Sequence, residues 1–432
     1  MSKLANPFTY GGPVDTKQFI GRTNELNRVF DQLTNQAHGS VAIIGERRVG
    51  KTSLLHYVAA PDVMKRWNLA EEQSIFIFQD CGAIAPFSLT RFWQTILRRL
   101  LHLLKRKFPY APLPDSIQAL LGATEITVLD IEFLLDEFYE HNLLLILMLD
   151  EFEALVRTDI ENEAITRDFL AGLRALINHV PRTLSVIVST RQPLDKVCKE
   201  VRFMGSPFYN NFVFVHLRPF NRTEAELLFD QMLANTGISF DQTEKDYIYN
   251  LAGTHPLLLQ AVASLIFELK VDSMAEIRDF GAVREQFCEL VEHQFEDFWK
   301  WSQPRERQIL TQLANGEEEA NTRLQAWADE RETLLRRGLI TKDKDGGYRI
   351  FSSVFWQWLI ANLYRLGEIR PPDSPEINDL KQQLLAYQRR LAVLQLQEAK
   401  LGLQAPPYLT IDIEDTQAKI ESLRARIAQK QD

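Results

Sequence analysis

The 432-residue chain has few cysteines, no long apolar run and no excess of basic residues. Its three cysteines, Cys81, Cys198 and Cys288, lie far apart and match no metal-ligand spacing, so we expect free thiols in a reducing cytoplasm. The longest wholly aliphatic run, Leu143 to Leu149, has about a third of the length that a transmembrane helix needs. The first residues contain no apolar core of a signal peptide. We therefore expect no membrane segment and a cytoplasmic location.

The charge balance also limits the range of functions. The formal net charge of −9 argues against a protein that coats nucleic acid, although it leaves room for a local basic face. With 45% hydrophobic and 25% charged residues, the composition is that of a globular protein. A chain of this length exceeds one ordinary core, so we expect roughly two to four domains.

Short apolar runs alternate with helical stretches in the first half of the chain. The runs cover residues 41–44, 75–78, 143–149, 184–188 and 212–215. Helices are predicted at about 24–35, 52–60, 88–106, 128–141 and 162–179. Nearly continuous apolar strands suit a sheet that is covered on both faces, and their alternation with helices implies parallel pairing. The sequence therefore predicts an α/β domain built on a parallel sheet.

The second half of the chain has a different character. After Arg222 the strand signal disappears, and Thr223 is the expected N-cap of the first helix of a helical lid. Residues 303–366 then combine two helices, a glycine-containing β-hairpin and a closing helix, which is the pattern of a winged helix. Beyond a proline-rich linker, apolar residues at steps of three and four predict an antiparallel, coiled-coil-like helical hairpin. The predicted divisions are 1–220 (core), 221–302 (lid), 303–370 (winged helix) and 371–432 (linker and hairpin).

One motif near the N-terminus carries the strongest functional signal. It matches G-x-x-x-x-G-K-[ST] between a predicted strand and a predicted helix, and it consists of Gly45, Glu46, Arg47, Arg48, Val49, Gly50, Lys51 and Thr52. Such a loop curls around phosphate, with its amide groups and the helix N-terminus facing the anion. Lys51 is expected to reach the β- and γ-phosphates, and the Thr52 hydroxyl to bind Mg²⁺. With Ser53 added, this segment forms the predicted site for ATP or ADP.

A second motif follows the third apolar run. The run ends in Asp150 and Glu151, as in a Walker B strand. We expect Asp150 to hold Mg²⁺, often through water, and Glu151 to polarise the attacking water. Glu153 is predicted to be a solvated helix residue. Together the two motifs predict an ATPase that uses Mg²⁺.

Arg191 follows the fourth predicted strand, which in this fold lies beside the P-loop strand. A cation at this position can sense the γ-phosphate, so we predict a catalytic role for it beside Lys51 and Glu151. The alternative is a surface arginine in the loop before Pro193.

Several segments together resemble the STAND class of signal-transduction ATPases. They are Asn6-Pro7-Phe8, Phe19-Ile20-Gly21-Arg22, the P-loop with its Arg47–Arg48 pair, Leu149-Asp150-Glu151-Phe152-Glu153 and Gly253-Thr254-His255-Pro256. This AAA-related branch includes archaeal-type and origin-recognition-like ATPases that have a winged helix behind the lid. The resemblance covers about residues 6–366.

The resemblance implies further site residues and a strand order. It implies a sheet ordered 5-1-4-3-2 and a γ-phosphate contact by Arg191. It also implies that the adenine packs on Ile20, Gly21 and Arg22, with Pro256 closing over the base.

Two positions are not assigned by the resemblance. His255 is expected to be a lid histidine with its hydrogen bonds satisfied, because Leu257 and the residues after it depart from the family pattern. No arginine finger can be placed, and Arg202 is only one candidate among the loop arginines.

The resemblance also implies a mode of action. ADP would keep the core, lid and winged helix closed, and ATP would open them and expose an assembly surface, with slow hydrolysis resetting the switch. The alternative is a DNA-associated ATPase of the initiator or transposition type. A ring-shaped motor and a non-enzymatic role, in which ATP only supports the fold, are further alternatives.

The C-terminal parts bear on the partners. Residues 300–370 contain twelve basic and ten acidic residues, so no basic face stands out and DNA binding is not favoured. We prefer a winged helix that acts as an intramolecular clamp. The hairpin at 376–430 is predicted to bind a protein partner or to mediate self-association, and packing against its own chain is the alternative.

Overall fold

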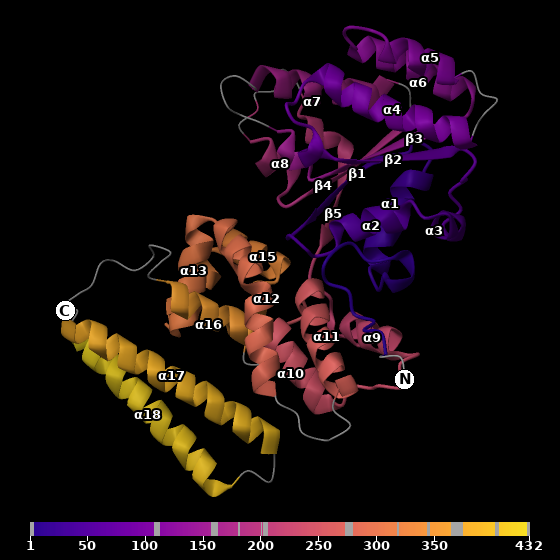
Figure 1. Cartoon of the computed structure of the whole chain (residues 1–432). Coiled ribbons are helices and arrows are strands. Elements are labelled where there is room, and N and C mark those ends of the chain that lie inside the picture. The colour runs from indigo at the N-terminus through magenta and orange to yellow at the C-terminus, as the bar shows by residue number, and fades with distance from the viewer. Residues whose placement is uncertain are drawn as a thin grey trace.

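The computed structural model places an α/β core, a helical middle part and a long C-terminal hairpin one after another along the molecule (Figure 1). It describes all residues except 1–3, 108–112, 157–162, 180–181, 200, 202–205, 273–279, 318, 344–345, 364–374, 402–405 and 430–432. Among the described residues, no helix is both long enough and apolar enough to span a bilayer.

A parallel sheet forms the centre of the core. Its strands are β1 (Ser40–Gly45), β2 (Ser74–Asp80), β3 (Leu144–Asp150), β4 (Leu184–Thr190) and β5 (Phe212–Leu217). The order is β2-β3-β4-β1-β5, so the predicted order is confirmed. Every residue of β1, β3 and β4 is buried, as a sheet covered on both faces requires. Because Ile44 pairs with Thr190, and Asp80 with Asp150, the carboxyl ends of these strands meet at one edge.

Helices cover the two faces of the sheet and pack in two apolar clusters. One face is covered by α1 (Thr23–Thr34), α2 (Lys51–Val58) and α3 (Pro61–Arg66). The other face is covered by α4 (Leu89–Lys107), α5 (Leu113–Leu121), α6 (Val128–Glu140) and α7 (Glu163–His179). Short connecting elements are η1 (Thr16–Gln18), η2 (Cys81–Ala83), η3 (Phe152–Ala154), α8 (Leu194–Val197) and η4 (Phe208–Asn211).

The lid follows the sheet and is helical, as expected. It consists of α9 (Arg222–Leu233), α10 (Gln242–Ala252), α11 (Pro256–Asp272) and α12 (Phe280–Lys300). The predicted N-cap Thr223 is wrong, because Asn221 caps α9 instead. The Asn221 side chain accepts a hydrogen bond from the Glu224 amide, and the Glu224 carboxylate accepts one from the Asn221 amide, both at 2.9 Å. This reciprocal capping box fixes the start of the lid.

The next elements have the order that was predicted for a winged helix, with one addition. They are α13 (Pro304–Asn315), α14 (Glu319–Ala326), α15 (Ala328–Arg337), β6 (Ile340–Lys342), β7 (Tyr348–Ile350) and α16 (Ser353–Asn362), and α14 was not predicted. We call residues 304–362 the winged-helix segment. Its Phe355 packs with Phe295 and Phe298 of α12 in one apolar cluster. The lid and the winged-helix segment therefore share a continuous core.

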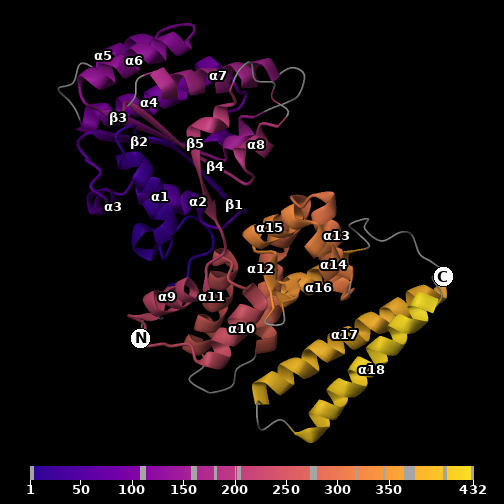
Figure 2. The same cartoon turned by 180° about the vertical axis from the view of Figure 1, so that it is seen from behind.

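The C-terminal hairpin has small cores of its own. Helices α17 (Pro375–Leu401) and α18 (Pro407–Gln429) lie side by side and run in opposite directions (Figures 1 and 2). Leu380 packs with Leu423 and Ile427 near one end, and Leu394 packs with Leu409 and Ile413 near the other. Both predicted apolar stripes thus face each other across the pair. One hydrogen bond to the winged-helix segment runs from the Arg424 guanidinium to the Asn315 carbonyl oxygen, at 3.4 Å.

Candidate nucleotide-binding site

The P-loop joins β1 to α2 and turns tightly. Gly50 has a φ of 106°, which only glycine adopts easily, and it precedes the first residue of α2. A Cβ at Gly45 would lie 2.8 Å from the Leu217 carbonyl oxygen, so β5 packs directly against the start of the loop. The Lys51 ammonium donates to the carbonyl oxygens of Gly45 and Glu46 at 2.9 and 3.1 Å. The lysine therefore lies over the loop, where phosphates would sit.

The two predicted Mg²⁺ ligands lie together. The Thr52 hydroxyl donates to one oxygen of Asp150 at 2.6 Å, and the Ser189 hydroxyl donates to the other. A hydroxyl and a carboxylate beside a phosphate site fit Mg²⁺, which prefers oxygen ligands and few protein donors. When bound, Mg²⁺ would neutralise phosphate charge. Ser189 was not identified from the sequence; the available signal was a hydroxyl near the carboxyl end of β4, which also contains Ser185 and Thr190.

Glu151 lies where the chain turns at the end of β3. Its φ is 51°, in the left-handed region, and its backbone amide donates to Ser189 and Asp150 at 3.2 Å. Its side chain is exposed, lines the cavity beside the P-loop and approaches Gly82 of η2. It is therefore open to solvent at the edge of the site, as a residue that polarises water must be.

Glu153 contradicts the expectation of a solvated side chain. The left-handed turn at Glu151 sends Phe152 into the core and returns Glu153 toward the P-loop. The Glu153 carboxylate lies 3.7 Å from Nε of Arg191, and its side chain is 22% exposed. Burial raises the pKa of Glu153, while the positive charges of Lys51 and Arg191 act in the opposite direction.

Arg191 lies at the edge of the same cavity. Its guanidinium is between the Glu153 carboxylate and the ring of Trp301, whose centroid is 4.5 Å away. Trp301 directly follows α12, so the predicted sensor arginine also contacts the end of the lid. Its side chain is 16% exposed, which differs from the surface arginine of the alternative interpretation.

The charge of Lys51 depends on its acidic neighbours. Burial lowers the pKa of Lys51, and Glu153, Glu46 and Asp150 oppose that shift, with Glu153 having the largest effect of the three. Without these carboxylates, the buried ammonium would be costly.

The predicted adenine end of the site lies under the N-terminal segment. A cavity of about 280 Å³ is lined there by Ile20, Arg22 and Pro256, together with the P-loop and the ends of β3 and β4. Gly21 has a φ of 66°, and it is not among the lining residues. The buried Arg22 guanidinium donates to the carbonyl oxygens of Arg218 and Val49, at 2.6 and 3.2 Å. Arg22 therefore ties the P-loop to the end of β5.

The sequence analysis missed the residues that cover this cavity. Tyr10, Gln18, Phe220 and Gln260 contribute to its walls. The Thr9 amide donates to the Gln260 side chain at 3.0 Å, so the N-terminal segment is attached to α11. Nothing in the local sequence identifies a partner this far along the chain.

The remaining P-loop residues are held by neighbouring segments. Arg47 forms an ion pair with Asp297 of α12, and Arg48 donates to the Gly11 carbonyl oxygen at 3.3 Å. The buried Val49 packs under the loop, and the Ser53 hydroxyl accepts a hydrogen bond from the Val14 amide at 3.2 Å. The nucleotide site thus contacts both the lid and the N-terminal segment.

Two predictions outside the motifs have different outcomes. His255 is buried, and neither ring nitrogen has a hydrogen-bond partner within the described part of the chain, so the prediction of a satisfied histidine is wrong. Burial lowers its pKa to about 4. Arg202 lies outside the described residues.

A larger cleft of about 1070 Å³ lies between α10, the β6–β7 hairpin and the C-terminal hairpin. None of the Walker residues is among the described residues that line it. We therefore assign the nucleotide to the smaller cavity, which contains the lysine, the hydroxyl and the acids.

Comparison with known families agrees with this geometry. Residues 8–342 match the family model described as Novel STAND NTPase 1. The chain belongs to this family. The matched residues of this STAND NTPase include the P-loop and the acidic end of β3.

Solved structures show the same fold. A Walker-type ATPase of Pyrococcus abyssi is similar, with 18% identity, a TM-score of 0.56, and coverage of 82% of this chain and 99% of that chain. The ORC2 protein of Aeropyrum pernix, solved as ADPNP–ADP complexes, is similar with 14% identity, a TM-score of 0.50, and coverage of 84% and 98%. Comparison with curated protein sequences gives no match.

Proposed function

We propose that this STAND NTPase is a slow ATPase and a molecular switch, in which the nucleotide controls the docking of the winged-helix segment on the core. One contact carries the proposal. Arg337, the last residue of α15, places its Nε 2.5 Å from a carboxylate oxygen of Glu46 in the P-loop. A change in the P-loop therefore acts directly on the winged-helix segment.

The other hydrogen bonds of Arg337 make this contact sensitive. Its guanidinium also donates to Ser302, Glu306 and the Phe298 carbonyl oxygen, at 2.9, 2.8 and 2.9 Å. Glu46 and Glu306 are both buried. Removing one member of a buried ion pair typically costs about 3–5 kcal/mol, because the remaining charge stays uncompensated. Docking is therefore strongly dependent on where Glu46 lies.

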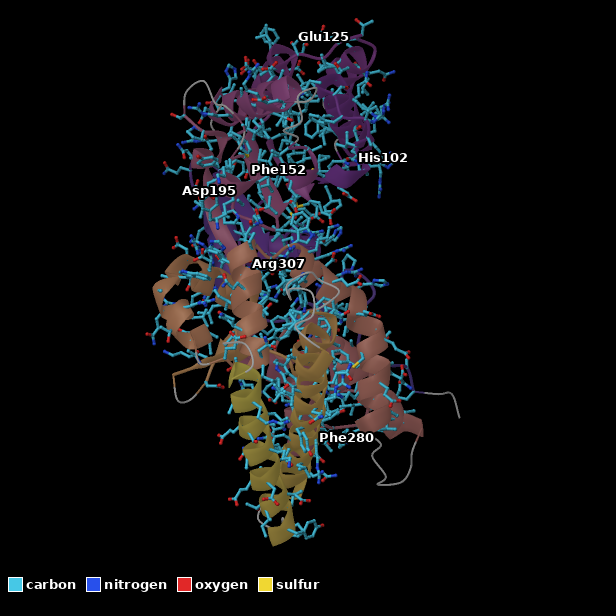
Figure 3. The ribbon with its side chains drawn as sticks, turned by 90° about the vertical axis from the view of Figure 1, so that its left-hand side faces the viewer. His102, Glu125, Phe152, Asp195, Phe280 and Arg307 are labelled. Atoms are coloured by element: carbon cyan, nitrogen blue, oxygen red, sulfur yellow. The ribbon has the colours of Figure 1, made fainter. Side chains whose placement is uncertain are left out.

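Two further contacts connect the site to the same end of α12. Arg47 pairs with Asp297, and Arg191 stacks on Trp301. Figure 3 shows Arg307 at this junction, where its side chain donates to the carbonyl oxygens of Trp299 and Lys300. A difference of about 1–3 kcal/mol between the two nucleotide states would be enough to bias docking.

The chemistry of hydrolysis would come from the Walker residues. Lys51 is positioned to bind phosphate, Thr52 and Asp150 to hold Mg²⁺, and Glu151 to orient water. In this proposal ATP and ADP are the ligands of the two states, and the switch works in the cytoplasm, where ATP and free thiols occur together. The hairpin α17–α18 would bind a protein partner or a second copy.

A DNA-associated role is the second candidate, and the contacts of α15 argue against it in this conformation. Glu332 of α15 pairs with Arg218 of the core at 3.3 Å, and Arg337 is bound to the P-loop. Arg331 and Arg336 bond within the winged-helix segment, to the Leu324 carbonyl oxygen and to Thr333. The helix that a winged helix presents to DNA is thus occupied by the core.

Light scattering in the absence of DNA tests the proposal. The molar mass and the hydrodynamic radius would be measured with ADP and with a non-hydrolysable ATP analogue. We expect the analogue alone to produce an expanded or assembled form, and Lys51→Ala to respond to neither nucleotide.

Two arginine variants make the test specific. Arg337→Gln in ADP should resemble the wild type with the analogue. Arg349→Gln is the matched control, because this exposed arginine pairs with Asp343 of its own hairpin and should leave the response unchanged. Identical behaviour of Arg337→Gln and the wild type in both nucleotides would contradict the proposal.

A further inference from the structure

Lys51, Glu153 and Arg191 form a charge cluster that the Walker motifs do not explain. Lys51 begins α2, Glu153 lies in η3 after the Walker B strand, and Arg191 directly follows β4. All three line the cavity that contains the P-loop. Arg191 pairs with the Glu153 carboxylate, and the Lys51 ammonium is close enough to interact with it electrostatically, at the place where the γ-phosphate is expected.

The carboxylate is incompletely bonded. Its Oε1 lies 3.7 Å from Arg191 Nε, which is an ion pair beyond ordinary hydrogen-bond length. Its Oε2 is buried and has no hydrogen-bond partner among the described residues. An ionised group in such a place is costly unless nearby charges compensate for it, so Glu153 depends on its two cations.

The charged groups around Glu153 come from three elements. Lys51 on α2 and Arg191 after β4 favour its ionised form, and Glu151 at the end of β3 disfavours it. Glu153 in turn has the largest effect of any acid on Lys51. The cluster is thus mutually dependent, and an incoming anion would compete with Glu153 for both cations.

We propose that the Glu153 carboxylate takes the place of the γ-phosphate in the ADP state. Glu153 interacts with Lys51 and Arg191 when ADP is bound, and the γ-phosphate of ATP displaces it from them. This inference rests on the proposed nucleotide switch and names the residue by which the site distinguishes ATP from ADP. The γ-phosphate carries more negative charge than one carboxylate, so it is the stronger partner for the two cations. ADP ends at the β-phosphate and leaves the carboxylate in place.

The change of partner at Arg191 can also reach the winged-helix segment, through Trp301. Arg191 stacks on Trp301, beside the Ser302 hydroxyl that Arg337 contacts. When Arg191 turns from Glu153 to phosphate, its position on the indole changes. The displacement of one partly buried carboxylate is thereby transmitted to the junction that holds the winged-helix segment.

The test compares the affinities for two nucleotides in the full chain. Dissociation constants for ADP and for a non-hydrolysable ATP analogue would be measured with Mg²⁺ by fluorescence titration. In Glu153→Gln the competing charge is gone, so we expect the ratio of affinities to shift about tenfold toward the analogue, the equivalent of one pKa unit. Glu125→Gln is the matched control, because this exposed glutamate lies at the far end of the core, away from the cavity (Figure 3), and its ratio should stay at the wild-type value.

A pH series separates this role from a structural one. In the wild type, a lower pH protonates Glu153 and removes the competition, so preference for the analogue should rise as the pH falls. Glu153→Gln removes that part of the pH dependence, and the titration of the analogue itself remains in both proteins. Glu153→Asp keeps the negative charge but places it farther from the two cations. Its ratio of affinities should therefore lie between those of the wild type and Glu153→Gln.

Specific outcomes would overturn the inference. One is an unchanged affinity ratio and pH profile in Glu153→Gln and Glu153→Asp, with native circular dichroism. Another is a complete loss of turnover in Glu153→Gln with an unchanged ratio, which would make Glu153 the general base. If the wild type binds neither nucleotide, the proposed function itself fails, and the ratio experiment distinguishes this case.

Discussion

At the scale of single residues, two neighbouring acids of the Walker B segment have opposite environments. Glu151 is exposed and faces η2, whereas Glu153 is partly buried beside the P-loop. The cause is the left-handed backbone at Glu151, which reverses the direction of the chain directly after β3. Residues two positions apart therefore have different surroundings in the same site.

Replacing Glu151 tests the assignment of hydrolysis. Glu151→Gln keeps the size of the side chain but cannot accept a proton from water, so we expect ATP to bind and to remain uncleaved. The measurement is phosphate release together with the nucleotide content of the purified protein. Unchanged ATP turnover in Glu151→Gln would contradict the catalytic role of Glu151.

Stability should depend on pH through His255. The pKa of this histidine is about 4 in the folded protein, against an ordinary value of 6.5. Between these values the unfolded chain binds more protons than the folded one, so the free energy of unfolding decreases as the pH falls below 6.5. The full difference corresponds to about 3 kcal/mol, reached near the folded pKa.

Urea unfolding at about pH 7.5 and pH 5 measures this dependence. His255→Asn should lose part of the decrease, since asparagine does not titrate in that range. His293→Asn is the matched control, because the His293 side chain is 97% exposed, and it should behave as the wild type. If the free energy of unfolding decreases equally between about pH 7.5 and pH 5 in the wild type, His255→Asn and His293→Asn, the assignment of this pH dependence to His255 is contradicted.

The motif residues could be predicted from the sequence because local spacing determines where they lie. Lys51 and Thr52 need only a strand, a tight turn and a helix, and Asp150 reaches them because β3 ends at the same edge of the parallel sheet. The burial of Glu153 and the contact of Arg191 with Trp301 could not, because both depend on how distant segments pack. The unbonded ring of His255 likewise reflects packing against α12, where Phe298 lies edge-on to it.

At the scale of elements, α15 is the helix that joins the winged-helix segment to the core. Its C-cap is Gly338, which has a φ of 70° and packs against Pro219 after β5. A Cβ at Gly338 would lie 2.9 Å from Cδ of Pro219 and closer still to Cγ. The close approach of the Pro219 ring to the Gly338 backbone thus requires glycine here.

Gly338→Ala should therefore loosen docking of the winged-helix segment. We expect a larger radius of gyration in X-ray scattering with ADP and faster proteolysis near the α15–β6 junction. Gly346→Ala is the matched control, because its φ of 86° imposes a similar backbone strain in open space. If both variants expand equally, strain and not the contact with Pro219 is responsible.

The strands were easier to predict than the small helices. Buried parallel strands are continuous apolar runs, as in β3, and the sequence shows each of the five. Helix α14 has the sequence EANTRLQA, whose polar residues resemble a loop. It is held by the packing of Ala320 and Leu324 and by the Asn321 side chain, which accepts a hydrogen bond from the Tyr348 amide at 2.9 Å. The cap of α9 was misplaced by two residues, because Asn221 and Thr223 both suit that position.

At the scale of the whole molecule, the hairpin should behave as a separate unit. Its two small clusters are distinct from the clusters of the core and lid. We expect amides of α17 and α18 to exchange with deuterium before those of β1 and α11, and ADP to slow exchange in β1 and α11 only. Slower exchange of α17 with ADP would show instead that the hairpin is coupled to the nucleotide site.

The order of the parts was accessible from the sequence, but their mutual contacts were not. Composition and periodicity indicated an α/β core, a helical lid, a winged-helix pattern and a hairpin in that order. The shared core of lid and winged-helix segment, with Phe295 against Phe355, involves residues that look like ordinary helix interiors. Long-range pairing of similar apolar side chains carries no local signature.

The N-terminal segment has a consequence for how the protein is made. Asn6 bonds to Ser264, 258 residues later, and Thr9 to Gln260, 251 residues later. The ribosome synthesises the first wall of the nucleotide pocket long before the helix that holds it. The core can fold as it emerges, but the pocket is completed only after α11 has been made. A truncated chain that ends within the lid would therefore carry both Walker motifs and still lack a closed site.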